Sequence, residues 1–92
     1  TVLSAEPHPD ADKLLVLKVK VGPEERTVVA GLRQHYQPTQ LIGKKIIMVA
    51  NLKSAKLRGV NSQGMVLAAE DDEGNLAVAT FDHDVTDGSI VR

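Results

Sequence analysis

The chain has no cysteine and no tryptophan, and its only aromatic side chains are Tyr36 and Phe81. Without cysteine it cannot form a disulfide scaffold, a thiolate nucleophile or a thiolate metal site. With two aromatics it has little to stack on the bases of single-stranded nucleic acid, where each stacked base contributes about 1–3 kcal/mol. Any nucleic acid would therefore be bound mainly through charge, shape and backbone contacts.

Acidic residues are missing from one long stretch, because no Asp or Glu occurs between Arg26 and Ala69. This stretch has a formal charge of +7, whereas residues 1–25 sum to −2 and residues 70–92 to −6. The whole chain has a net charge of only −1. Such local concentration of positive charge is typical of a site for a polyanion.

Three of these basic residues, Lys53, Lys56 and Arg58, lie in a segment rich in Gly, Ser and Asn, which we predict to be a loop between two apolar strands. Arg58 suits bidentate binding of a phosphate, and the lysines act as mobile point charges. The same segment offers neutral hydrogen-bond donors at Asn51 and Ser62. The alternative interpretation of this segment is a solvated charged loop that binds no ligand.

The 92 residues suffice for one small domain, and no apolar run approaches the ~20 residues of a membrane-spanning helix. A short helix is predicted over 37–42, because Pro38 suits its first turn and Gly43 its end. Extended segments separated by turn residues are predicted at 1–5, 14–21, 26–32, 44–50, 65–69, 76–80 and 90–92. This pattern predicts an all-β fold, namely a five-stranded oligonucleotide-binding (OB) barrel with one short helix and extra short C-terminal strands.

Candidate catalytic or metal-ligating residues are few. His8, Asp10 and Asp12 lie close together in HPDAD, as do His83 and Asp84. Beside proline, Asp and His are common turn residues, and an Asp side chain can cap nearby backbone N–H groups. We therefore expect a structural turn at His8–Asp12 and no catalytic residue, metal or cofactor.

Three segments together resemble the tRNA-binding OB domain: HPDADKL at 8–14, VAGL at 29–32 and NLKSAKLRGVNSQGM at 51–65. That domain is appended to methionyl-tRNA synthetases, begins the phenylalanyl-tRNA synthetase β chain and occurs as free tRNA-binding proteins. It is also similar to the C-terminal module of endothelial monocyte-activating polypeptide II. The short helix followed by VANL at 49–52 is similar to the methionyl type.

The resemblance implies a non-catalytic cytoplasmic domain that binds tRNA by its folded shape, without reading an anticodon. It implies a C-terminal domain of methionyl-tRNA synthetase or a free relative, a homodimer, and a synthetase catalytic domain in the same or another chain as partner. The residues that match the family's motif and are implied as tRNA contacts are Lys13, Asn51, Lys53, Lys56, Arg58 and Ser62.

Two departures from the family pattern affect these expectations. Ser54 stands where the family commonly has proline, so the loop is expected to be less rigid. We also expect residues 1–92 to be one tRNA-binding OB-fold domain that lacks the start of its first strand. The alternative function is a dimeric, chaperone-like OB protein that binds peptides, which would need an apolar groove at a dimer interface.

Overall fold

The computed structural model describes all residues from 1 to 92 and confirms the all-β class with one short helix. The helix, α1, spans Pro38–Leu41 and is too short to cross a membrane. The nine strands are β1 (Val2–Pro7), β2 (Leu15–Val21), β3 (Glu24–Ala30), β4 (Met48–Val49), β5 (Ala55–Leu57), β6 (Val60–Ser62), β7 (Met65–Val66), β8 (Ala68–Glu70) and β9 (Leu76–Val78).

The largest sheet is the antiparallel sheet β1-β2-β3. Its middle strand β2 alternates as the sequence predicted: Leu15, Leu17 and Val19 are buried, whereas Lys18 and Lys20 are exposed. Side chains of a strand point alternately to opposite faces, so one face of β2 forms the core and the other meets solvent. A two-residue turn joins β2 to β3, because Val21 pairs with Glu24.

The helix α1 closes one side of this core. At its start the Gln37 amide donates to Oε1 of Gln40 at 2.7 Å, and Pro38 occupies the first turn, as the sequence predicted. Leu41 at its end is fully buried in the core cluster, together with Val2, Leu15, Leu17, Val19, Val28 and Leu32. Gly43 then adopts a φ of +87°, which favours glycine and turns the chain back along β1. Its amide donates to the carbonyl of Val2 at 2.8 Å.

The second half of the chain is less regular than predicted. Of the expected strand at 44–50 only Met48–Val49 pairs, with β7. The expected strand at 65–69 divides at Leu67, whose amide donates to Ile47 at 2.9 Å while its carbonyl accepts from Ala79 at 3.0 Å. The chain therefore changes partner at this residue, from β4 to β9. Overall the strands form four separate antiparallel sheets, without one continuous ladder.

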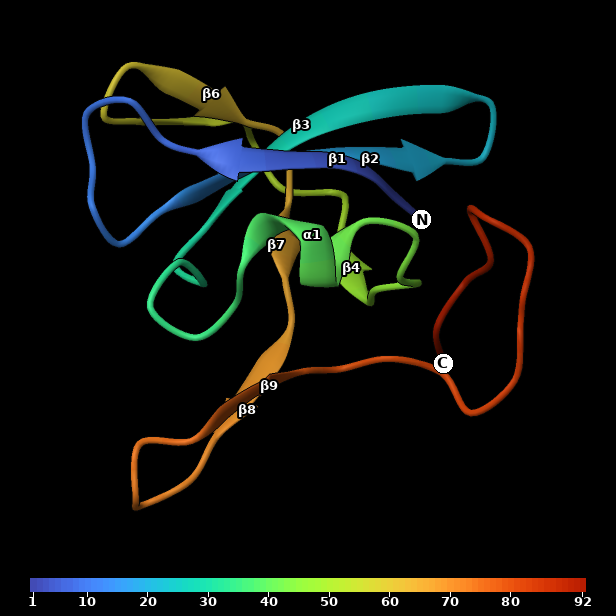
Figure 1. The fold of residues 1–92 in the computed structure, drawn as a ribbon. Helices are drawn as coiled ribbons and strands as arrows, with labels where there is room; N and C mark the ends of the chain where they lie inside the picture. Colours follow the sequence, from blue (N-terminus) through green and yellow to red (C-terminus); the bar gives the residue numbers. More distant parts are fainter.

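The hairpins lie on different sides of the molecule. Figure 1 shows β8 and β9 extending away from the β1-β2-β3 sheet, whereas the β5-β6 hairpin lies beside it. The predicted strand at 90–92 is wrong: these residues pair with no strand, and Ile90 is 85% exposed.

Candidate nucleic-acid interface

The segment that the sequence predicted as a basic loop contains a hairpin, β5-β6, and we call residues 51–61 the basic hairpin. Leu57 pairs with Val60, so Arg58 and Gly59 alone form its turn. Their φ angles are +54° and +92°, and a two-residue turn of type I′ requires positive φ at both positions. Arg58 is the chain's only non-glycine residue with positive φ. The turn therefore holds an arginine at the hairpin tip in a conformation that arginine rarely adopts.

Lys53, Lys56 and Arg58 are all exposed, and none of them makes an ion pair with the chain. Exposed cations without a partner keep their full charge and can approach a phosphate with little desolvation. Asn51, at the start of the basic hairpin, is also exposed. These four predicted contacts thus lie on one connected, solvent-facing segment.

Other basic residues of the acid-free stretch serve the fold. The guanidinium of Arg26 pairs with Glu24 at 2.7 Å. Lys45 lies 3.2 Å from Asp87 and 3.7 Å from Asp84. The formal +7 of residues 26–69 therefore overstates the charge available to a ligand.

Arg26 also clamps the two ends of the basic hairpin. Its Nη1 donates to the carbonyl of Ala50 at 2.5 Å and to that of Gln63 at 3.3 Å. Gln63 is further tied to β3, because its amide donates to the carbonyl of Thr27 at 2.8 Å and its Oε1 accepts from the Thr27 amide at 2.9 Å. The base of the hairpin is thus fixed to the central sheet, a role for Arg26 that sequence reasoning missed.

Ser62 needs a correction. The sequence placed it among the exposed donors, but it is only 5% exposed. Its Oγ accepts from the Val29 amide at 2.9 Å and donates to the carbonyl of Gly64 at 3.0 Å. A Cβ on Gly64 would lie 2.9 Å from Sδ of Met48, so the chain passes β4 too closely for a side chain. Ser62 therefore supports the hairpin from inside and has no free donor for RNA.

Lys13 lies near the tip of the basic hairpin. It is exposed, and it lines a shallow hollow of about 350 Å³ together with Ala11, Asp12, Leu14 and Arg58. The structure thus brings Lys13 and Arg58, which are far apart in the sequence, to the same hollow. No three His, Asp or Glu side chains are grouped in a way that could hold a metal ion.

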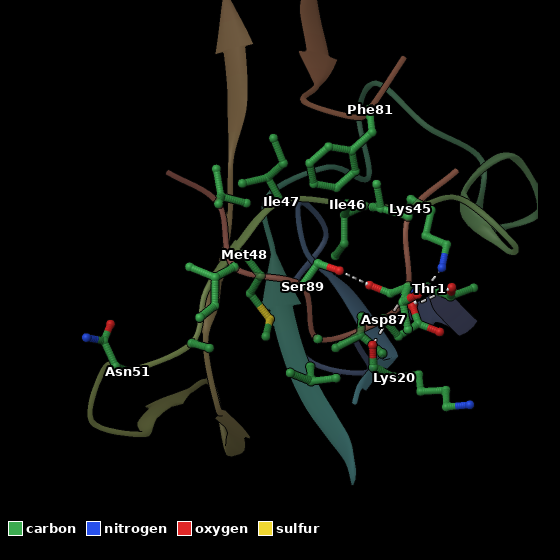
Figure 2. A pocket seen from close by; sticks show the side chains of 18 residues that line it. Thr1, Lys20, Lys45, Ile46, Ile47, Met48, Asn51, Phe81, Asp87 and Ser89 are labelled. Atoms are coloured by element: carbon green, nitrogen blue, oxygen red, sulfur yellow. Dashed lines mark hydrogen bonds and ion pairs between the residues drawn. The ribbon is translucent and has the colours of Figure 1, made fainter. Parts of the chain in front are cut away.

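A larger hollow of about 610 Å³ lies between the segment at 45–48, which leads into β4, and the C-terminal segment at 85–91. Figure 2 shows Ile46, Ile47 and Phe81 lining it, with Asn51 at its edge. Most of its lining residues are hydrophobic. It is therefore a different kind of surface from the basic hairpin.

Asp87 closes one end of this hollow (Figure 2). Its Oδ1 accepts from the Thr1 hydroxyl at 2.7 Å and from Nζ of Lys45 at 3.2 Å. Asp87 thus ties the C-terminal segment to the edge of β1.

The chain is similar to known proteins in both sequence and fold. The chain is 55% identical over 91 residues to a methionine–tRNA ligase of Deinococcus radiodurans, covering 99% of this chain and 13% of the ligase. It superposes on the crystal structure of a MetRS-related protein from Pyrococcus horikoshii with a TM-score of 0.92 and 41% identity, covering 99% of this chain and 84% of that one. The chaperone CsaA of Bacillus anthracis shares the fold, with a TM-score of 0.88 at 24% identity, covering 100% and 85% of the two chains.

The chain therefore spans only a small part of the ligase that it matches. A family model, in contrast, covers nearly all of this chain. Residues 1–90 match the family described as "Putative tRNA binding domain". The chain therefore belongs to this family of tRNA-binding domains.

Proposed function

We propose that the chain binds folded tRNA through its basic hairpin and does no chemistry itself. The observation that carries this proposal is a set of three exposed, unpaired cations on the basic hairpin, namely Lys53, Lys56 and Arg58. The base of this hairpin is fixed to the central sheet. Cations on a segment whose base is fixed stay together on one surface and can contact several phosphates of a folded RNA, whereas a flexible tail supplies only net charge.

The contacts follow from side-chain chemistry. Arg58, at the hairpin tip, presents a planar guanidinium that can bind two phosphate oxygens. Lys53, Lys56 and Lys13 add charges without fixed geometry, and Asn51 adds a neutral donor. Family membership and the resemblance of the NLKSAKLRGVNSQGM segment support these assignments.

Folded RNA is favoured over single strands because neither aromatic side chain lies on the basic hairpin. The hydroxyl of Tyr36 accepts from the Val78 amide at 2.9 Å, and its ring packs against the core. Phe81 lines the apolar hollow. The basic hairpin thus offers no ring for base stacking, on which single-strand binders commonly rely.

We place the domain in a methionyl-tRNA synthetase or a free relative of one, in the cytoplasm. The relatives that it matches are methionine–tRNA ligases, of which it spans 13–14%. A weak tRNA contact tethered to a synthetase catalytic domain, in the same or another chain, would raise the local concentration of tRNA there. This arrangement explains why a small charged surface without catalytic residues is useful.

A second candidate is peptide binding by a dimer, which the apolar hollow of about 610 Å³ favours. Ile90 and Val91 line it and are 85% and 56% exposed, so apolar surface is available there. A homodimer would cover such surface, and its mass can be measured in solution. Peptide binding in this hollow should persist at high salt, because it relies on apolar burial.

The test compares labelled folded tRNA with a single-stranded oligonucleotide of the same length, titrated with the chain at several salt concentrations. We expect folded tRNA to bind more tightly, and its affinity to fall steeply with salt. Equal affinity for the two RNAs would contradict the proposal. Salt-insensitive binding of an apolar peptide, with no preference for tRNA, would support the second candidate instead.

A further inference from the structure

Apart from the β5-β6 ladder, in which Ala55 pairs with Ser62, the basic hairpin makes a single hydrogen bond to the rest of the chain. Nε2 of His8 lies 3.0 Å from the carbonyl oxygen of Leu57, the last residue of β5. The other hydrogen bonds of residues 51–61 belong to the β5-β6 ladder, and the clamps of Arg26, Ser62 and Gln63 act only at the base. Residues 51–59 are also exposed, so little apolar burial fixes the tip.

His8 itself is held firmly. It is 2% exposed, and its Nδ1 accepts a hydrogen bond from the Asp10 amide at 3.0 Å. An acceptor nitrogen carries no proton, so the ring proton is on Nε2 and is donated to the Leu57 carbonyl. The His8 ring therefore caps the turn at 8–12 that the sequence predicted, and its other nitrogen links this turn to the basic hairpin.

The consequence lies at the hairpin tip. Lys13 follows the turn that His8 caps, and Arg58 follows Leu57 directly, so the His8 link joins the two segments that carry these cations. Both side chains line the same hollow. We propose that His8 is a positioning residue, which holds the basic hairpin against the 8–14 loop so that Arg58 and Lys13 bind RNA phosphates together. This inference rests on the proposed function, and it adds a residue that does not touch RNA.

Two substitutions separate the functions of the two ring nitrogens. His8→Asn keeps an acceptor near the position of Nδ1 for the Asp10 amide but cannot reach Leu57. His8→Gln places an amide donor near the position of Nε2 and keeps the link while weakening the cap. His8→Ser is a second variant that retains a capping oxygen and cuts the link. In His8→Asn and His8→Ser the Leu57 carbonyl can hydrogen-bond to water instead, because Leu57 is exposed.

We expect His8→Asn and His8→Ser to weaken tRNA binding about fivefold, the usual worth of one such hydrogen bond, and His8→Gln to bind within about twofold of the wild type. Urea unfolding reports whether each variant is folded. Equal losses for the Asn and Gln variants, in step with their stabilities, would show a merely structural role and overturn the inference.

A double-mutant cycle adds a readout that loss of stability does not move. Arg58→Gln should cost less affinity in the His8→Asn background than in the wild type, because an unlinked tip already uses Arg58 poorly. Additive losses would overturn the inference. Amide hydrogen exchange without RNA should be faster for residues 55–62 in His8→Asn than in His8→Gln. A wild-type chain that fails to bind tRNA would refute the proposed function, whereas normal binding by His8→Asn refutes only the role of His8.

Discussion

Neutralising the basic hairpin should change how tRNA binding depends on salt. The perturbation is the triple variant Lys53→Gln, Lys56→Gln, Arg58→Gln, which removes every charge of residues 51–61. A matched control, Lys18→Gln, Lys20→Gln, Lys44→Gln, removes three exposed and unpaired cations from outside the hairpin. Both variants have the same net charge, so a difference between them reports position and not net charge.

The magnitude follows from the number of cations at the interface. With Lys13, the hairpin offers four phosphate contacts, which correspond to a slope of about −3.6 in log affinity against log salt. Between 50 and 200 mM salt, affinity of the wild type should fall about 150-fold. The triple variant keeps only Lys13, so its slope should be about −0.9 and its fall only about 3.5-fold.

Fluorescence anisotropy of labelled tRNA at four or five salt concentrations measures both slopes. The control variant should keep a slope close to that of the wild type. An unchanged slope in the triple variant, or equal changes in the two variants, would refute the assignment of the interface to the basic hairpin.

Three further predictions concern stability. Arg58→Asn should raise the free energy of unfolding by about 0.5–1 kcal/mol, because Asn-Gly suits a turn with two positive φ angles, and it should still lower tRNA affinity. A loss of stability in urea melts would show that Arg58 is not strained at its positive φ. Leu17→Ala, at a fully buried core position, should cost about 2–5 kcal/mol, and a smaller cost would show a loosely packed core. The ion pair between Lys45 and Asp87 predicts a stability contribution that is present above about pH 4 and is lost as pH falls, because protonation of the carboxylate removes its charge. The difference in urea midpoint between the wild type and Asp87→Asn should therefore shrink below pH 4, and a constant difference would argue against the ion pair.

The parts of the fold that the sequence predicted are those set by local pattern. The alternation of Leu15, Leu17 and Val19 with lysines fixes which face of β2 is buried, whatever the rest of the chain does. Pro38 and Gly43 similarly bracket α1, because each limits the backbone at its own position. Local constraints of this kind can be read without knowing tertiary contacts.

The parts that the sequence did not predict depend on distant partners. The burial of Ser62 follows from the Val29 amide, 33 residues away in the chain. The prediction of a strand at 90–92 was wrong because an apolar segment forms a strand only where another strand pairs with it, and no strand pairs with these residues. The β5-β6 hairpin was missed because arginine is an unusual residue at a positive φ, so its turn lacked the usual Asn-Gly or Asp-Gly signal.

One missed feature did have a signal in the sequence. Glu24 and Arg26 are two residues apart on β3, so their side chains leave the strand on the same face and can pair. Glu24 lies just before the acid-free stretch that begins at Arg26, so the formal charge of that stretch does not include it. The consequence of this pair is that Arg26 fixes the hairpin base, and the charge available to RNA is smaller than the formal count.

An NMR titration of the isotope-labelled chain with folded tRNA tests directly whether the basic hairpin is the surface that binds tRNA. If the basic hairpin binds tRNA, amide shift changes concentrate at residues 51–61 and at Lys13, with the β8-β9 hairpin unaffected. Changes concentrated instead at 45–48 and 85–91, around the apolar hollow, would contradict it.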